Sequence, residues 1–169
     1  DKYGFTWQLI LTSPDGEPRP CIIPSLMFGG PVQNRANEAI EYYVSVFQNS
    51  KRGLAAPYAQ STGPAHADSL MFAEFQLENQ WFTAMDSGVE QAFTFNEAVS
   101  YAVLCKDQDE IDYLWSKLSS TPEAEQCGWC RDKFGVAWQI VPENIEELMQ
   151  KPNAYKTMMN QHKIVIAEY

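Results

Sequence analysis

The fold is decided by the stretch Asp132-Lys133-Phe134-Gly135-Val136-Ala137-Trp138-Gln139-Ile140, because the chain carries it a second time. The other copy is Asp1-Lys2-Tyr3-Gly4-Phe5-Thr6-Trp7-Gln8-Leu9. Asp, Lys, Gly, Trp and Gln recur at the same places in both copies, so internal repetition is the first feature to explain. In the first copy apolar side chains alternate with small or polar ones, which predicts a strand over residues 3–12.

Composition and charge narrow the classes of partner. The chain has 169 residues, with 12 Lys and Arg against 22 Asp and Glu, and a formal net charge of −10. An acidic protein repels nucleic acid and anionic membrane surfaces at long range, so we expect neither as a partner. No run of about twenty apolar residues is present, and we expect a cytoplasmic protein. The length suits one ordinary domain that folds without disulfides or metal.

Local patterns predict two similar halves. In the first half we expect a helix capped by Asn34 or Asn37, and strands over residues 21–28, 51–58, 70–78 and 81–86. In the second half we expect a helix capped by Asp107, with Glu110 completing a capping box, and strands over residues 98–106, 123–131 and 134–141. Together with the repeat, these patterns predict the order β, α and three strands in each half.

The same patterns divide the chain into parts. Residues 1–20 are expected to form an extension that resembles a closing strand and a turn. Residues 21–142 are expected to form two modules, 21–90 and 91–142, and residues 143–169 a helical tail. Two explanations of the extension stay open. Either the chain is a fragment of a longer tandem protein, or the first strand pairs with an edge of the same or a partner subunit.

Several stretches resemble one protein family. They are Ser25-Leu26-Met27-Phe28, Glu38 to Phe47 with Asn49-Ser50-Lys51, Phe95-Asn96-Glu97-Ala98, and Gln126-Cys127-Gly128-Trp129 followed by Asp132 to Pro142. Together they resemble the PhnB-like branch, also labelled 3-demethylubiquinone 3-methyltransferase-like, of the glyoxalase, bleomycin-resistance and extradiol-dioxygenase (vicinal oxygen chelate) superfamily. The resemblance implies an α+β fold of paired βαβββ modules, whose curved mixed sheet surrounds a small-molecule cleft, here with an extra N-terminal strand. It also implies a homodimer, in one arrangement with the N-terminal strand exchanged.

The resemblance allows a metal site to be tested. Metal-dependent members draw one His, Glu or Gln ligand from each of the first, fourth, fifth and eighth strands. In this chain those places hold Ile23 or Pro24, Asp86 or Met85, Ser100, and Gln139. Ser and neutral Gln are poor ligands, so a divalent metal is disfavoured and we predict no cofactor. The methyltransferase label finds no support either, because no Gly-rich strand-to-helix loop followed by an acidic residue is present.

Small side chains on two predicted strands leave room for a ligand. Ser100 lies between two alanines on one face of the fifth strand, and Gln139 shares a face of the last strand with Gly135 and Ala137. This pattern suits a ligand cavity, although a helix packed on the small residues would produce it too. The resemblance favours the cleft. The ligand-binding candidates are Ser100, Gln139, Asp86, Ala102, Ala137, Trp129 and Glu97.

Cys127-Gly128-Trp129-Cys130 has the spacing of a thiol redox motif. In such motifs the first Cys lies at a helix N-terminus, whose dipole lowers the thiol pKa. Here the segment is predicted to be extended, where residues three apart point to opposite faces, so we interpret the cysteines as two packed thiols.

The leading functional hypothesis is a PhnB-like, glyoxalase-superfamily protein that binds a small organic ligand in the cleft between its modules. A first alternative is a metal-dependent lyase, isomerase or dioxygenase-type enzyme of the same superfamily, which predicts about one divalent ion per chain. A second is a non-catalytic sequestration protein or a structural module of a longer tandem protein. The sequence leaves open whether the ligand is turned over.

Overall fold

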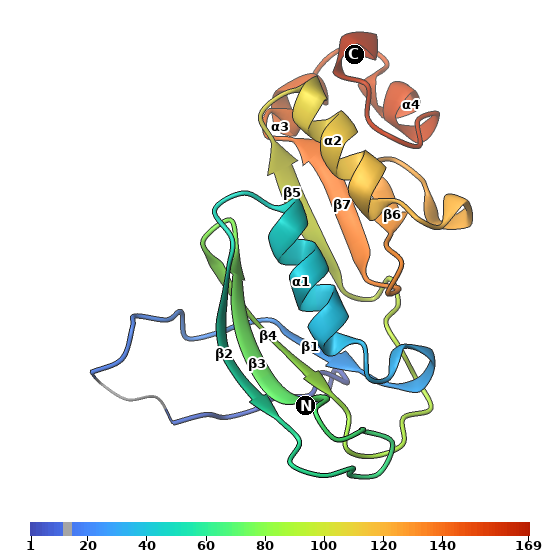
Figure 1. Ribbon diagram of the computed structural model, residues 1–169. Coiled ribbons are helices and arrows are strands. Elements are labelled where there is room, and N and C mark those ends of the chain that lie inside the picture. The colour runs from blue at the N-terminus through green and yellow to red at the C-terminus, as the bar shows by residue number, and fades with distance from the viewer. Residues whose placement is uncertain (12–14) are drawn as a thin grey trace.

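The first half of the chain forms a four-stranded sheet with one helix against it (Figure 1). The computed structural model describes residues 1–11 and 15–169. The elements of this half are β1 (Ser25–Phe28), the 3-10 helix η1 (Gly30–Val32), α1 (Ala36–Val46), β2 (Lys51–Pro57), β3 (Leu70–Leu77) and β4 (Gln80–Asp86). The strand order is β1-β4-β3-β2, with β1 parallel to β4 and the other neighbours antiparallel. This unit has the predicted order of β, α and three strands.

The second half forms a smaller sheet. Its elements are β5 (Ser100–Cys105), α2 (Gln108–Leu118), the 3-10 helix η2 (Pro122–Ala124), β6 (Trp129–Arg131) and β7 (Ala137–Pro142). The strand order is β5-β7-β6, with β5 parallel to β7 and β6 antiparallel to it. The tail adds α3 (Ile145–Leu148), α4 (Ala154–Met159) and a last 3-10 helix, η3 (Ile166–Glu168).

The second half has the three strands predicted by residue range, one fewer than the order of β, α and three strands requires. The strand predicted over residues 123–131 is wrong in its first part, because only Trp129–Arg131 is a strand. Cys127 and Gly128 have φ angles of 54° and 86°, which an extended strand does not contain. A Cβ on Gly128 would lie 2.8 Å from the carbonyl oxygen of Ile140, so this turn requires glycine. The structure is therefore α+β with two mixed sheets that stay open rather than joining into one.

The predicted N-terminal strand is wrong for this chain, because residues 1–11 contain no strand. Their apolar side chains face solvent, and Trp7 is 57% exposed and Leu9 96%. A strand needs a neighbour for its backbone N–H and C=O groups, and alternation alone does not tell whether that neighbour is present. Residue 12 and the first part of the predicted turn, residues 13–14, lie outside the described residues.

The two long helices are capped in different ways. At α2, Asp107 accepts a hydrogen bond from the Glu110 amide at 2.9 Å, which confirms the predicted cap. At α1 neither predicted asparagine is the cap. The first amide of α1, that of Ala36, donates instead to the carboxylate of Asp86 at 3.1 Å. Asn34 has a φ of 65° and accepts from the amide of His66 at 3.0 Å, which ties the loop before β3 to the helix start.

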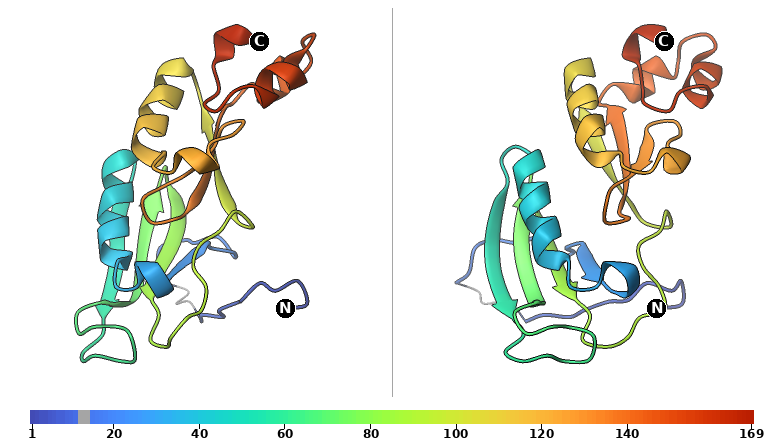
Figure 2. Two further views of the ribbon diagram at one scale, coloured as in Figure 1. Left: turned by 90° about the vertical axis from the view of Figure 1, so that its right-hand side faces the viewer. Right: turned by 45° about the vertical axis from the view of Figure 1, so that its right-hand side comes forward.

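Aromatic side chains join the two halves into one core. The rings of Tyr43 on α1 and Tyr101 on β5 each lie 5.5 Å from Trp138 on β7, and the ring of Phe28 lies 6.2 Å from Phe134. Figure 2 shows α1 and α2 on the same side of the sheets. Of the helices in the described ranges, none combines the length and apolar character that crossing a membrane requires.

Candidate functional site

Of the two long helices in the described residues, α2 packs on one face of the second sheet and neither packs on the other (Figure 2). The strand register pairs Ser100 with Ala137, and it pairs Gln139 with both Ala102 and Trp129. Paired residues point to the same side of a sheet, so these predicted residues come together. We call this surface the open face, and it consists of Ser100, Ala102, Trp129, Arg131, Gln139 and, buried at 1% exposure among them, Ala137.

A hydrogen bond joins the two polar residues that the sequence predicted. Gln139 donates from Nε2 to Ser100 Oγ at 2.7 Å. The serine hydroxyl and the second N–H of the Gln139 amide can still donate, and the Gln139 carbonyl oxygen can still accept. The open face therefore has hydrogen-bonding groups that a ligand can use.

Arg131 is a residue of the open face that the sequence reasoning missed. Its register partner on β7 is Ala137, and its guanidinium forms an ion pair with Glu97, a predicted candidate in the segment before β5. Its Nε is buried without a hydrogen-bond partner among the described residues. Alternation along β6 from Trp129 would have placed Arg131 on this face.

Asp86 lies elsewhere, on the helix side of the first sheet. Its side chain is buried and accepts from the amides of Ala36 at 3.1 Å and Leu70 at 3.0 Å. Burial raises the pKa of Asp86, and the backbone N–H groups oppose that rise. Asp86 thus fixes the starts of α1 and β3, and the structure does not bring it to the open face.

The corresponding face of the first sheet is partly covered by the N-terminal extension, which runs behind the sheet in Figure 1. Arg19 pairs with Glu74 at 2.7 Å, and its guanidinium carbon lies 4.4 Å from the centre of the Trp81 ring. Gln8 also contacts Met85, with 3.4 Å between Nε2 and Sδ. The second sheet therefore offers the more accessible face.

A pocket of about 420 Å³ adjoins the open face at Arg131. It lies between η1, the segment before β5 and the turn at residues 132–135. Thr94, Ser120 and Thr121 are among its lining residues, and Thr94 Oγ1 is buried with no hydrogen-bond partner in the described chain. This pocket gives the open face a recess at its rim with a mixed polar and apolar lining.

The residues at the family's metal positions do not fit a divalent ion. Ile23 and Pro24 precede β1, and the positions of β1 and β4 that face away from α1 pair Ser25 with Thr83 and Met27 with Met85. Hydroxyls and thioethers are weak ligands for such metals. Within residues 1–11 and 15–169, no three His, Cys, Asp or Glu side chains form a group that could hold a metal. We derive no chemical step through a metal.

The four cysteines are free thiols. Cys130 on β6 is buried, and burial raises its pKa to about 12, while Cys127 lies in the turn before it. Neither residue lies at the start of a helix, and a raised pKa keeps a thiol protonated and unreactive. Cys130 is therefore a packed thiol, whereas Cys127 is only partly buried, in a turn rather than in the extended segment that the sequence predicted.

The fold and the open face define a class of protein: an α+β protein of two β/α units with a polar sheet face on which neither long helix packs. Residues 20–141 match the family described as 3-demethylubiquinone-9 3-methyltransferase. The chain belongs to this PhnB-like family.

One solved structure supports this assignment, and a second is similar in fold alone. The PhnB protein of Bacillus cereus, which carries the same methyltransferase description, is 34% identical, with a TM-score of 0.61 over 72% of this chain and 99% of that protein. The protein PA1353 of Pseudomonas aeruginosa is similar in fold, with 22% identity and a TM-score of 0.54 over 72% of this chain and 96% of that one. No curated protein matches the chain.

The residues do not fit a nucleotide-like methyl donor, although the family's name refers to methyl transfer. Such donors lie at a Gly-rich loop between a parallel strand and a helix N-terminus. The comparable loop here is Gly29-Gly30, and a Cβ on Gly29 would lie 2.9 Å from Gln91, so another segment covers it. The first amide of α1 is also taken by Asp86. We derive no step through such a donor.

Proposed function

We propose that the open face binds a small organic ligand, and that the chain is a cytoplasmic binding protein of the glyoxalase superfamily. The observation that carries the proposal is the 2.7 Å hydrogen bond between Gln139 and Ser100, on a sheet face that neither long helix covers. It supports binding because a fixed polar pair beside small side chains is what orients a ligand in a cavity.

The side chains around this pair indicate the ligand's chemistry. Trp129 offers a flat apolar surface beside Gln139, and the recess at Arg131 has a mixed polar and apolar lining. The carboxylate of Glu97 is held in its ion pair with Arg131. The face therefore supports recognition of a compact molecule with one apolar and one hydrogen-bonding side, and it favours sequestration over turnover.

Ligand binding should raise the melting temperature of the chain. In a thermal-shift screen of small polar organic compounds, a compound present at about 100 times its Kd should stabilise the wild type by about 2.7 kcal/mol. Gln139→Ala and Trp129→Ala should each weaken its binding by about 1–3 kcal/mol, because each removes a contact at the centre of the face.

Tyr155→Ala is the matched control, because Tyr155 is an exposed aromatic residue on α4, outside the open face. It should leave the ligand-induced shift unchanged. A shift that survives both substitutions on the open face would contradict the proposal. Metal analysis that returns about one divalent ion per purified chain would favour the metal-dependent alternative.

We also propose that the chain forms a homodimer, as the family resemblance implies, in which a second copy pairs along the outer edge of β5. Leu104 on β5 is 63% exposed, and the outer edge of β5 has no strand neighbour among the described residues. An uncovered edge beside an exposed apolar side chain favours pairing.

Sedimentation should therefore give a mass of roughly 38 kDa, twice the 19.2 kDa of one chain. Leu104→Asp should shift the mass to that of one chain, because burying a carboxylate at an apolar interface is unfavourable. A wild-type chain that sediments as a monomer would rule out this dimer.

A further inference from the structure

The turn that leads into β7 is held by one carboxylate, that of Asp132. Its Oδ1 accepts from the amides of Phe134 at 2.8 Å and Val136 at 3.0 Å, and its Oδ2 accepts from Trp138 Nε1 at 2.9 Å. The amide of Gly135, which has a φ of 90°, donates to the Asp132 carbonyl at 3.0 Å. The Asp132 side chain thus accepts from two amides of the turn and from the indole of the strand that follows.

Residues 1–7 contain the same arrangement. Asp1 Oδ1 accepts from the amides of Tyr3 at 2.8 Å and Phe5 at 3.2 Å, and Oδ2 accepts from Trp7 Nε1 at 2.9 Å. Gly4 has a φ of 88°, and its amide donates to the Asp1 carbonyl at 3.2 Å. The repeat in sequence is therefore also a repeat in structure, and the turn forms even though residues 1–11 have no strand partner.

The two copies differ in what surrounds them. Asp132 Oδ2 accepts a further hydrogen bond from the Tyr43 hydroxyl at 2.7 Å, and Trp138 is 2% exposed. In the first copy Trp7 is 57% exposed, and Asp1 has no tyrosine hydroxyl as partner among the described residues. The first copy has the internal hydrogen bonds of the second without its packing.

The surroundings of the second copy show what the first one lacks. The ring of Trp138 lies 5.5 Å from that of Tyr43 on α1 and 5.4 Å from that of Phe47, directly after α1. Its strand, β7, lies between β5 and β6. In this chain β7 occupies the position between β5 and β6, so residues 1–11 cannot dock there. The apolar side chains of residues 1–11 therefore match a surface outside the described chain.

We propose that residues 1–11 are the closing strand of a second module pair of this family. That partner would present a helix with a tyrosine at the place of Tyr43 and two strands at the places of β5 and β6. Docking there gives Asp1 its missing hydrogen bond and buries Trp7.

The test is a fusion in which residues 20–131 are joined directly ahead of Asp1 and followed by the complete chain. Residues 1–11 then stand where residues 132–142 stand in the original. The readout is the solvent isotope shift of the Trp7 resonance in 19F NMR of fluorotryptophan-labelled protein, assigned with Trp7→Phe. We expect the shift to be present in the chain alone and lost in the fusion, because Trp7 becomes buried.

Two variants sharpen the result. In the first variant of the fusion, residues 1–11 are changed to the sequence of residues 132–142. Its substitutions are Tyr3→Phe, Phe5→Val, Thr6→Ala, Leu9→Ile, Ile10→Val and Leu11→Pro. The second variant is Tyr43→Phe in the added segment. It should restore part of the isotope shift, because it removes the hydroxyl that would donate a hydrogen bond to Asp1. If Trp7 stays exposed in the unsubstituted fusion, the proposal is wrong, whether or not the six substitutions bury Trp7. Trp7 already buried in the chain alone overturns it too.

Discussion

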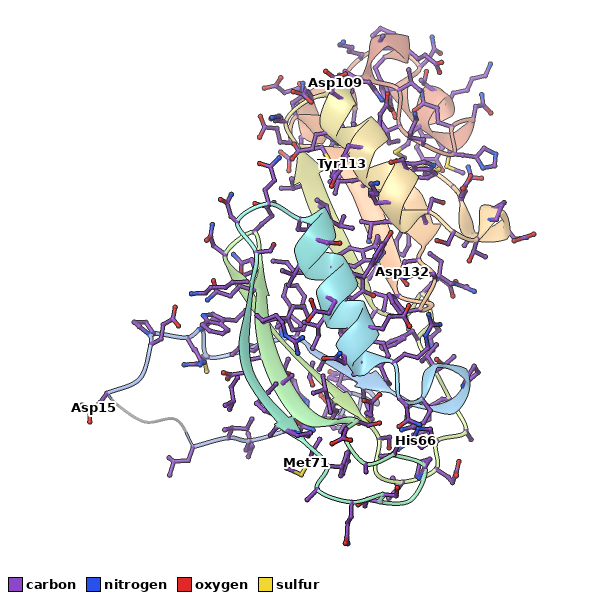
Figure 3. The ribbon with its side chains drawn as sticks, viewed as in Figure 1. Asp15, His66, Met71, Asp109, Tyr113 and Asp132 are labelled. Carbon is purple, nitrogen blue, oxygen red and sulfur yellow. The ribbon has the colours of Figure 1, made fainter. Side chains whose placement is uncertain are left out.

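Asp132→Ala should lower the free energy of unfolding by about 3–5 kcal/mol. The substitution leaves four donors without their acceptor: two backbone amides of the turn, the indole N–H of Trp138 and the hydroxyl of Tyr43. Asp132 is buried, so water cannot replace the lost bonds without opening the core. Figure 3 shows Asp132 beside α1, where the two halves meet. Urea unfolding followed by tryptophan fluorescence measures the change.

The chain contains its own matched control, Asp1→Ala. Asp1 accepts three of the same hydrogen bonds, but its side chain and its partners are exposed. Its removal should change the free energy of unfolding by less than about 0.5 kcal/mol. Equal losses for the two substitutions would show that the turn hydrogen bonds, and not their burial, set the stability.

The Asp132 carboxylate should also affect how the free energy of unfolding depends on pH. Burial raises the pKa of Asp132 above its ordinary value of 3.8, against the hydrogen bonds that favour the charged form. The native state then holds this proton more tightly than the unfolded chain does. The contribution of Asp132 to stability therefore falls as the pH rises from 3.8 through the native pKa. Asp132→Asn should lack this fall, and identical pH slopes in both proteins would contradict it.

Asp86→Ala should cost about 2–4 kcal/mol of unfolding free energy, because it removes a buried acceptor from two backbone amides. The amides are those of Ala36 and Leu70, at the starts of α1 and β3. Asp107→Ala at the exposed cap of α2 is the control, with an expected loss of about 1 kcal/mol. Urea unfolding measures both.

A ligand assay separates the structural role of Asp86 from the ligand-binding role that the sequence suggested. Because Asp86 lies on the helix side of the first sheet, ligand affinity per folded molecule should stay the same in Asp86→Ala. If Asp86→Ala loses ligand affinity at temperatures where it remains folded, Asp86 belongs to the ligand-binding site.

Local patterns were enough to predict those parts of the fold whose cause is local. The alternation in residues 70–86 predicted the β3 and β4 hairpin, and Asp107 with Glu110 predicted the start of α2. The start of α1 was missed because its cap, Asp86, lies fifty residues away from Ala36 in the chain. No local pattern identifies a partner at that distance.

The sequence also predicted part of the candidate site, again where alternation along a strand was enough. Alternation on two strands placed Ser100 and Gln139 on one face, and the parallel register of β5 and β7 brought them into contact. Arg131 was not among the predicted residues, although alternation from Trp129 places it on the same face. Asp86 was misplaced because alternation gives two faces without telling which one the helix covers.

The hydrogen bond from Tyr43 to Asp132 spans 89 residues, which has a consequence for synthesis of the chain. A ribosome that has reached only residue 131 has already produced α1, but not the turn and strand that cover Tyr43 and Phe47. The nascent chain then presents an uncovered aromatic surface until β7 emerges, and such surfaces aggregate or recruit chaperones. The aromatic core between the two halves is therefore complete only after β7 has left the ribosome.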